Sequence, residues 1–146
     1  MLINIKSLLL AGLQFLFIFL LLSGTSIIHI SLLAITFIFL SLVLIFWAIF
    51  AMQKSKLSIL PEPAANAILI TNGPYHYIRH PMYTAILLCS TGLLIHQFSP
   101  IRLAIAIALT IVLVIKLKWE EKMLLQKFDA YDLYMRNTKC LLPFIY

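Results

Sequence analysis

The sequence predicts an all-α integral membrane protein with about four transmembrane helices and a cytosolic C-terminal amphipathic helix. Of its 146 residues, 63% are hydrophobic and 11% are charged, whereas a typical soluble domain has roughly 45–50% and about 25%. No Asp, Glu, Lys or Arg occurs between Ser7 and Gln53, and such a stretch cannot form a water-exposed surface. Because lipid would leave the edges of an open sheet without hydrogen-bond partners, the spanning segments are expected to be helices.

Four apolar segments are expected to form these helices. They run from about Ile5 to Ser23, from Ile27 to Met52, from Met82 to Phe98 and from Ile101 to Leu117. The second can cross the hydrocarbon with tilt, while the last two stand at the lower end of the spanning range of roughly 17–25 residues. Turn formers from Ser23 to Ser26 predict a tight hairpin between the first two helices. A cleaved signal peptide is the competing interpretation, which the lack of a convincing small-x-small cleavage site disfavours.

The basic residues are distributed unequally between the two sides of the membrane. Under the four-helix topology, Arg102 alone lies on one side and the other Lys and Arg residues lie on the opposite side. The positive-inside rule then places both termini in the cytoplasm, in a bacterial-type inner membrane or a plasma membrane. Membrane orientation therefore explains the net charge of +6, and no nucleic-acid partner is expected.

The whole chain is expected to form one membrane domain. Its parts are an N-terminal helical hairpin (1–52), a cytosolic loop (53–81), a second helical hairpin (82–117) and a cytosolic C-terminal segment (118–146). The density of proline in the loop excludes a long helix there. The cysteines Cys89 and Cys140 are interpreted as reduced thiols. Nothing in the sequence sets an oligomeric state, so homo-oligomers remain open.

The most informative polar segment runs from Thr71 to Tyr83. One interpretation is an interfacial belt in which tyrosines and histidines lie at headgroup level and Arg79 binds lipid phosphate. The alternative is a binding site, because Asn72-Gly73-Pro74 is a turn and Pro81 keeps His80 out of helical geometry. A metal pair of His76 and His80 would need a helix that Pro81 opposes, so no metal site is expected.

A second polar segment, from Lys116 to Phe128, continues the last apolar run as an amphipathic helix. Its charges are explained most simply as a solvated face with lysines that snorkel at the membrane boundary. However, the adjacent carboxylates of Glu120 and Glu121 are costly if this helix folds back over the membrane domain. A cationic partner is then expected, and a bound cation could be that partner.

At these two segments the sequence resembles the isoprenylcysteine carboxyl methyltransferase family and, more loosely, the phospholipid methyltransferases. The matching motifs are Gly73-Pro74-Tyr75, Arg79-His80-Pro81-Met82-Tyr83, Glu120-Glu121, Phe128 with Tyr131 and Tyr134, and Leu141-Leu142-Pro143-Phe144. The resemblance implies a membrane enzyme that uses S-adenosylmethionine to methylate a lipophilic small molecule or prenylated substrate. The favoured acceptor is the carboxylate of a prenylcysteine-like molecule. The alternatives are a phospholipid amine methyltransferase and a non-enzymatic protein that binds membrane lipid.

The resemblance also implies roles for individual residues. The positions implied to contact S-adenosylmethionine are Ala67, Ile68, Leu69, Ile70, Tyr75, His80, Pro81, Met82, Tyr83 and Glu120. Lys116 stands where the family uses a basic residue to hold the substrate, and lysine in place of arginine loses bidentate recognition but keeps the charge. Arg79 and Glu121 are the other catalytic candidates, since an amine acceptor needs a base such as His80 or Glu121. The C-terminal segment would cap the cofactor.

Overall fold

The computed structural model describes residues 5–26, 28–54 and 68–141. Its α-helices are α1 (Ile5–Leu22), α2 (Leu32–Ala51), α3 (Pro81–His96), α4 (Pro100–Lys127) and α5 (Tyr131–Asn137), and its short 3-10 helices are η1 (Met52–Lys54) and η2 (Gly73–His76). Within these residues the only β-type pairing is a parallel bridge between Ile78 and Lys139. The expected all-α fold class is therefore confirmed.

The helices α1, α2 and α4 are long and apolar enough to cross a membrane. The helix α3 is also apolar, but it has only 16 residues, so the expected count of four spanning helices is not established. The helix α4 continues without a break from the apolar run to Lys127, as the sequence predicts. The helix α2 begins at Leu32 and not near residue 27, because Ser31 caps it by accepting a hydrogen bond from the backbone of Ala34.

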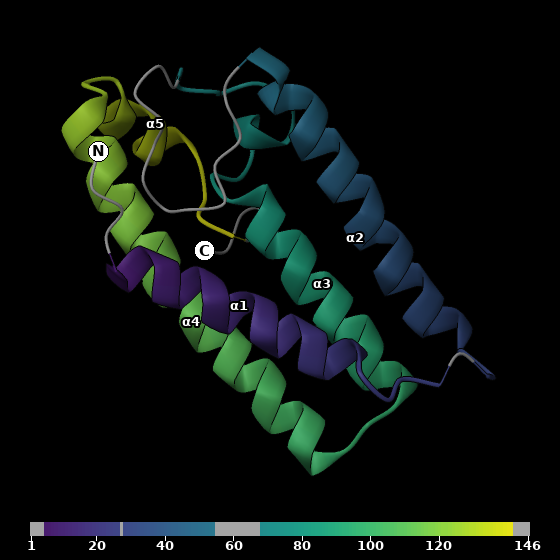
Figure 1. Cartoon of the computed structure of the whole chain (residues 1–146). Helices are drawn as coiled ribbons and strands as arrows, with labels where there is room; N and C mark the ends of the chain where they lie inside the picture. The colour runs from purple at the N-terminus through teal and green to yellow at the C-terminus, as the bar shows by residue number, and fades with distance from the viewer. Residues whose placement is uncertain (1–4, 27, 55–67, 142–146) are drawn as a thin grey trace.

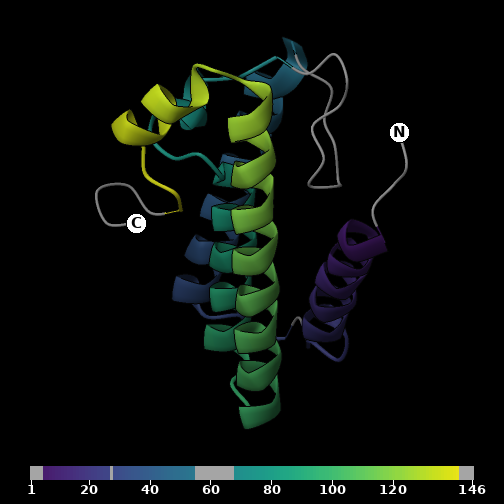
Figure 2. The same ribbon diagram turned by 90° about the vertical axis from the view of Figure 1, so that its left-hand side faces the viewer.

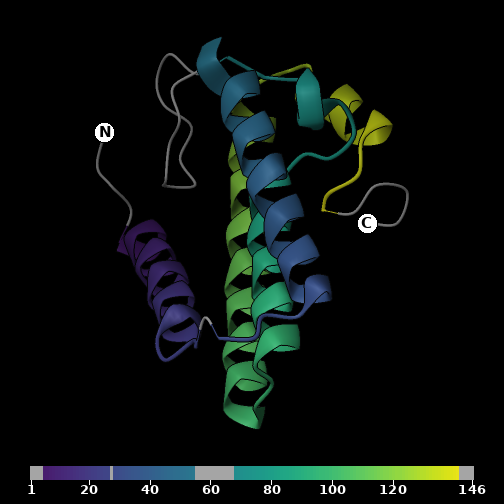
Figure 3. The ribbon, with the colours of Figure 1, turned by 90° about the vertical axis from the view of Figure 1, so that its right-hand side faces the viewer.

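The helices α2, α3 and α4 lie side by side, with α3 between the other two (Figure 1). Figures 2 and 3 show α2, α3 and α4 running alongside one another, with α5 at the end where α4 finishes. The main packing partner of α2 is α3, and that of α1 is α4. The expected hairpin of α1 and α2 is therefore a connection in sequence, while each helix packs against a different partner.

Close packing between α2 and α3 depends on Gly92. A Cβ atom at this position would come within 3.0 Å of the Ile38 side chain and 3.1 Å of the Ala34 carbonyl oxygen. Small residues at such contacts let membrane helices approach closely. Beside this interface, Leu21, Leu93, Ala106, Leu109 and Leu113 form an apolar core that joins α1, α3 and α4.

The end of α1 is also tied to the beginning of α4 by polar contacts. One guanidinium nitrogen of Arg102 donates to the Ser23 carbonyl at 3.2 Å and to the Thr25 hydroxyl at 3.0 Å. Ser99 caps α4 by accepting from the backbone N–H of Arg102. These contacts fix α1 against α4 at the end of the helices opposite to α5.

At the other end, the C-terminal segment folds back onto the residues that precede α3. The Arg79 N–H donates to the Lys139 carbonyl at 2.8 Å, and the His80 N–H donates to the Cys140 carbonyl at 3.1 Å. The short helix α5 lies at this same end of the bundle, where α4 finishes (Figure 1). This closure brings the residues before α3 and the charged end of α4 into contact.

Candidate functional site

The two polar segments identified in the sequence meet at one end of the helices. The Tyr83 hydroxyl donates a hydrogen bond of 2.8 Å to Oε2 of Glu120, and Nε of Arg79 lies 2.6 Å from Oε1 of Glu121. The imidazole of His80 lies between the two carboxylates, with Nδ1 3.8 Å from Glu120 and Nε2 3.4 Å from Glu121. The acidic pair therefore faces the residues that begin α3.

His80 owes its position to the proline that follows it. Pro81 is the first residue of α3, and His80 stands just before the helix with φ −125° and ψ 61°, outside the α-helical region that a following proline disfavours. Its ring stacks on that of Tyr83, with centroids 5.4 Å apart and an interplanar angle of 3°. The buried His80 Nε2 makes no hydrogen bond within the described residues. The ring is thus held by stacking on Tyr83, with Nε2 buried and turned towards Glu121.

Arg79 is surrounded by groups of the protein itself. Besides contacting Glu121, it donates from one terminal nitrogen to the carbonyl oxygens of Met135 at 3.1 Å and Thr138 at 2.5 Å. Burial lowers the pKa of the Arg79 guanidinium, but the hydrogen bond and charge of Glu121 outweigh this effect and raise the pKa above its ordinary value. These contacts differ from the interfacial interpretation, in which Arg79 binds lipid phosphate. They make Arg79 a link between Glu121 and the C-terminal segment.

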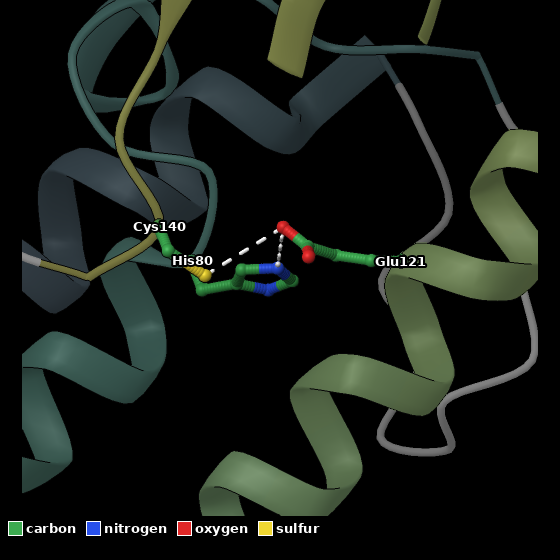
Figure 4. A group of neighbouring side chains, drawn as sticks. All are labelled: His80, Glu121 and Cys140. Carbon is green, nitrogen blue, oxygen red and sulfur yellow. Dashed lines mark hydrogen bonds and ion pairs between the residues drawn. The ribbon is translucent and has the colours of Figure 1, made fainter. Parts of the chain in front are cut away.

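Glu121 also gathers His80 and Cys140 around one carboxylate oxygen (Figure 4). Potential ligand atoms of these three residues lie within 4.8 Å of one another, which a metal ion could use. However, Oε1 of Glu121 already pairs with Arg79, so a metal ion would stand close to a guanidinium charge. Burial, and then the charge of Glu121, raises the pKa of the Cys140 thiol to about 12. The cluster is better described as a hydrogen-bonded network than as a metal centre.

The His76 and His80 pair considered in the sequence does not form a second cluster. His76 is exposed and packs edge-on against Tyr77, with ring centroids 5.0 Å apart. It belongs to η2, whereas His80 lies beyond the end of that short helix. The two imidazoles therefore do not share the face of one helix, as the position of Pro81 predicts.

The turn before α3 is confirmed and positions Tyr75. Gly73 has φ +62°, and a Cβ atom there would come within 2.9 Å of the Ala51 Cβ atom, so only glycine fits without strain. The Tyr75 hydroxyl donates to the Met52 sulfur at 2.8 Å, and the Tyr75 carbonyl accepts from the Tyr134 hydroxyl at 2.6 Å. Tyr75 is thereby fixed between the end of α2 and α5.

The other residues implied in cofactor binding lie around this turn and the beginning of α3. Pro81 is buried and Met82 is half-buried at the first turn of α3. Ile68 is exposed, whereas Leu69 and Ile70 are half-buried on the chain that leads into η2. Ala67 lies outside the described residues. The described candidates therefore lie at the same end of the bundle, on the chain from Ile68 to Tyr83 and at Glu120 on α4.

Lys116 lies one turn deeper than Glu120 and is only 2% exposed. Its ammonium nitrogen lies 5.5 Å from the centre of the Tyr83 ring and donates to Oε1 of Gln14 at 2.8 Å. Sequence reasoning did not identify Gln14, which comes from α1. The available signal was an amide in the middle of the apolar run of α1, because polar residues in such helices usually serve a function.

Chemically, the site combines aromatic faces with carboxylates near a boundary of the apolar helices. Tyr83 and His80 present stacked rings, and Glu120 offers a carboxylate that is 29% exposed. Aromatic faces attract cations, and a carboxylate forms strong hydrogen bonds with an ammonium group. The arrangement can therefore hold a positively charged small molecule.

Comparison with known proteins gives the family. A family model described as phospholipid methyltransferase matches residues 30–130, which is more than half of the chain. A search of the curated proteins finds no match. The matched residues include those that form the site on α3 and α4. Of the two families that the sequence resembles, the match is therefore to the phospholipid methyltransferases, to which the resemblance is looser. The chain therefore belongs to the phospholipid methyltransferase family and is a membrane methyltransferase.

Proposed function

We propose that the protein transfers a methyl group from S-adenosylmethionine to the headgroup amine of a membrane phospholipid. The observation that carries the proposal is the contact of Tyr83 with Glu120 at 2.8 Å, beside the stacked His80 ring. This contact joins an aromatic surface to a carboxylate at the boundary of the apolar helices. The family to which the chain belongs supports the same chemistry.

The residues present fit S-adenosylmethionine, which supplies the methyl group as part of a sulfonium cation. The rings of Tyr75, His80 and Tyr83 can stabilise a positive charge by cation–π attraction. Glu120 can accept hydrogen bonds from the ammonium of the amino-acid end. Pro81 and Met82, together with Ile68, Leu69 and Ile70, would supply the apolar and backbone contacts. The adjacent Glu121 pairs with Arg79 and is therefore not assigned to the cofactor.

An amine acceptor must lose a proton during methylation, and the site offers a base for this step. Nε2 of His80 is buried and faces Glu121 at 3.4 Å, while Nδ1 faces Glu120, the proposed cofactor carboxylate, at 3.8 Å. We assign Nδ1 the role of accepting the proton from the amine, and Glu121, beside Nε2, the role of stabilising the imidazolium that forms. Arg79 keeps Glu121 in place through the contact of 2.6 Å. Holding the reactants in a dry, ordered site supplies much of the rate.

The site is assigned to the cytoplasmic side. Lys6, at the beginning of α1, lies 5.8 Å from the Trp119 ring on α4, so the N-terminal end of α1 is at the same end of the bundle as the site. Basic residues concentrate at this end, and the positive-inside rule favours the cytoplasm for it. Both termini would then be cytoplasmic in an inner or plasma membrane.

A carboxylate acceptor, such as that of a prenylated cysteine, is the second candidate. The observation that favours it is the buried ammonium of Lys116 beside the Tyr83 ring, since a carboxylate would pair with this charge. A carboxylate also needs no base. This acceptor would leave His80 without a proton to accept, so the two acceptors differ in their dependence on that residue.

Calorimetry on the protein in detergent tests cofactor binding. Glu120→Gln and His80→Ala are expected to weaken the binding of S-adenosylmethionine on the order of tenfold, as loss of a contact with a charged group implies. The matched control is Asp132→Asn, because Asp132 is exposed on α5 and its carboxylate pairs with Arg136. If all three variants bound S-adenosylmethionine with the affinity of the wild-type protein, the proposed site would be ruled out.

Methyl-labelled S-adenosylmethionine identifies the acceptor. The protein is incubated with vesicles of phosphatidylethanolamine and phosphatidylcholine, or with an S-prenylated cysteine in the same vesicles, and products are analysed by mass spectrometry. Label on phosphatidylethanolamine supports the amine acceptor, and label on the cysteine derivative supports the carboxylate. If the protein binds the vesicles but labels neither phosphatidylethanolamine nor the cysteine derivative, both acceptor proposals are contradicted and a non-enzymatic role is favoured.

A further inference from the structure

A second polar cluster lies at the end of the bundle opposite to the candidate site. There Arg102 of α4 reaches the end of α1 and is only 8% exposed. Its terminal nitrogen Nη2 donates to the Ser23 carbonyl at 3.2 Å and to the Thr25 hydroxyl at 3.0 Å. The other terminal nitrogen, Nη1, is buried and has no hydrogen-bond partner within the described residues. The guanidinium is therefore held through one nitrogen, while the N–H groups of the other lack an acceptor.

No carboxylate in the described residues compensates the charge of Arg102. The acidic residues that the structure describes all lie at the other end of α4 or in the residues that follow it, and they are Glu120, Glu121, Asp129 and Asp132. The acceptors that Arg102 does have are a carbonyl and a hydroxyl, which are dipoles without a full charge. A buried charge and a buried donor are both costly when they are unpaired. An anion from outside the chain would supply the missing acceptor and the missing charge together.

The surroundings of Arg102 are held in place by the protein itself. Ser99 caps α4 by accepting a hydrogen bond of 3.1 Å from the backbone N–H of Arg102. The turn that follows α1 is also held by the end of α3, because the Gln97 side-chain oxygen accepts from the Ser26 N–H at 3.3 Å and the His96 ring contacts the Ser26 carbonyl. A ligand would therefore meet a guanidinium whose position is already fixed, which lowers the entropic cost of binding.

The position of Arg102 along its helix corresponds to the headgroup level of a bilayer. Arg102 is the third residue of α4, a helix long and apolar enough to cross a membrane. The apolar side chains of Phe98 and Ile101, which precede it, are 68% and 74% exposed, so they face lipid in a membrane. Basic side chains between membrane helices attract the phosphates of anionic lipids. The lipid that surrounds this end of the bundle is therefore the nearest source of an anion.

We propose that Arg102 binds the phosphate of an anionic phospholipid in the leaflet opposite to the candidate site. A phosphate oxygen would accept from Nη1, while Nη2 keeps its contacts with Ser23 and Thr25. Binding displaces part of the cover over Nη1, and the ion pair that forms is shielded from water, which strengthens it. The lipid would thereby join α1 to α4 at this end. The inference concerns a second site, and it does not depend on the proposed methyl transfer.

Lipid binding is measured on the full chain in detergent by native mass spectrometry, without S-adenosylmethionine. The probes are phosphatidylglycerol, which has a net negative charge, and phosphatidylcholine, whose phosphate is balanced by its own choline. Wild type is expected to bind phosphatidylglycerol more tightly than phosphatidylcholine. Arg102→Gln is expected to weaken the binding of phosphatidylglycerol on the order of tenfold, which is the effect of losing a hydrogen bond to a charged group. Binding of this lipid by Arg102→Gln with wild-type affinity would overturn the inference.

Two control variants separate the site from general charge and from the contact between α1 and α4. Lys118→Gln removes one positive charge from an exposed position at the other end of α4. Thr25→Val removes one of the contacts of Nη2 but leaves Nη1 intact. Both variants are expected to bind phosphatidylglycerol as wild type does. A loss in Lys118→Gln equal to that in Arg102→Gln would show that binding follows net charge, and the inference would then be wrong.

Hydrogen exchange on the wild-type protein in lipid nanodiscs provides a test that needs no substitution at Arg102. Discs of phosphatidylcholine are compared with discs that also contain phosphatidylglycerol, and with phosphatidylcholine discs in inorganic phosphate. With phosphatidylglycerol, the amides of residues 23–26 and of the first turn of α4 are expected to exchange more slowly, because the lipid holds α1 against α4. Equal exchange with and without phosphatidylglycerol would overturn the inference. The same protection from inorganic phosphate alone would overturn the assignment of a lipid and identify a free anion as the ligand.

Discussion

Nε of Arg79 lies 2.6 Å from Oε1 of Glu121, and both side chains are nearly buried, at 10% and 13% exposure. The same guanidinium donates to the backbone carbonyls of Met135 and Thr138. One side chain thus joins the residues before α3, the charged end of α4 and the segment that follows α5. The closure of the site depends on this residue.

Arg79→Gln is therefore expected to destabilise the protein. Removing one partner of a buried ion pair leaves the other charge uncompensated, which costs about 3 kcal/mol. The matched control is Arg136→Gln, because Arg136 pairs with Asp132 on the exposed face of α5 and such pairs contribute about 0.5 kcal/mol or less. Denaturant unfolding in detergent measures both variants. Similar losses for the two arginines would contradict the importance of the Arg79 contacts.

Two glycines give a matched pair of substitutions to alanine. Gly73 has φ +62° and its added Cβ would approach Ala51 and Trp47, whereas a Cβ at Gly12 meets nothing within 4 Å. Gly73→Ala is expected to cost about 2 kcal/mol, from left-handed backbone and from crowding. Gly12→Ala, within α1, is expected to be neutral or to add up to about 1 kcal/mol. Thermal unfolding is expected to give a lower midpoint for Gly73→Ala than for Gly12→Ala. Equal midpoints for the two variants would show that the turn does not need glycine.

The thiol of Cys140 is expected to react slowly with alkylating reagents in the folded protein. Burial and the neighbouring Glu121 raise its pKa from near 9 to about 12, and the thiolate is the reactive form. Because the folded state favours the neutral thiol, this contribution to stability is present below about pH 9 and is lost as the pH rises towards about 12. Labelling of a Cys89→Ser variant at pH 8, before and after unfolding, measures the difference. Equal rates would contradict the burial of Cys140.

Removal of metal ions is expected to leave the site intact. The oxygen of Glu121 that faces His80 and Cys140 is paired with Arg79, so the network is held together without a metal ion. Dialysis against a chelator should change neither the unfolding midpoint nor the binding of S-adenosylmethionine. Recovery of lost binding on adding zinc back would overturn this view and identify the cluster as a metal site.

Local rules in the sequence were sufficient for several parts of the site. Asn72-Gly73-Pro74 predicts the turn that becomes η2, and Pro81 predicts the irregular backbone at His80. The continuation of the last apolar run into a charged helix is confirmed by α4, which extends to Lys127. These features depend on neighbouring residues alone, so a single sequence contains the information for them.

Contacts between distant segments could not be derived in the same way. The helices α1 and α2 are apolar on all sides, so no hydrophobic stripe indicates which partner each one packs against. The pairing of Gln14 with Lys116 follows from that packing, as does the return of the C-terminal segment to Arg79. The sequence resemblance placed the acidic pair near the turn, but the residues that hold it there needed the structure.

The shortness of α3 has a consequence for the surrounding bilayer. Its 16 residues reach about 24 Å at about 1.5 Å per residue, whereas the hydrocarbon layer is about 30 Å thick. A helix of this length crosses the bilayer only where the hydrocarbon is thinned, where flanking side chains extend to the interface or where helices associate. Local thinning would bring lipid headgroups nearer to Pro81, at the beginning of α3 and next to the candidate site.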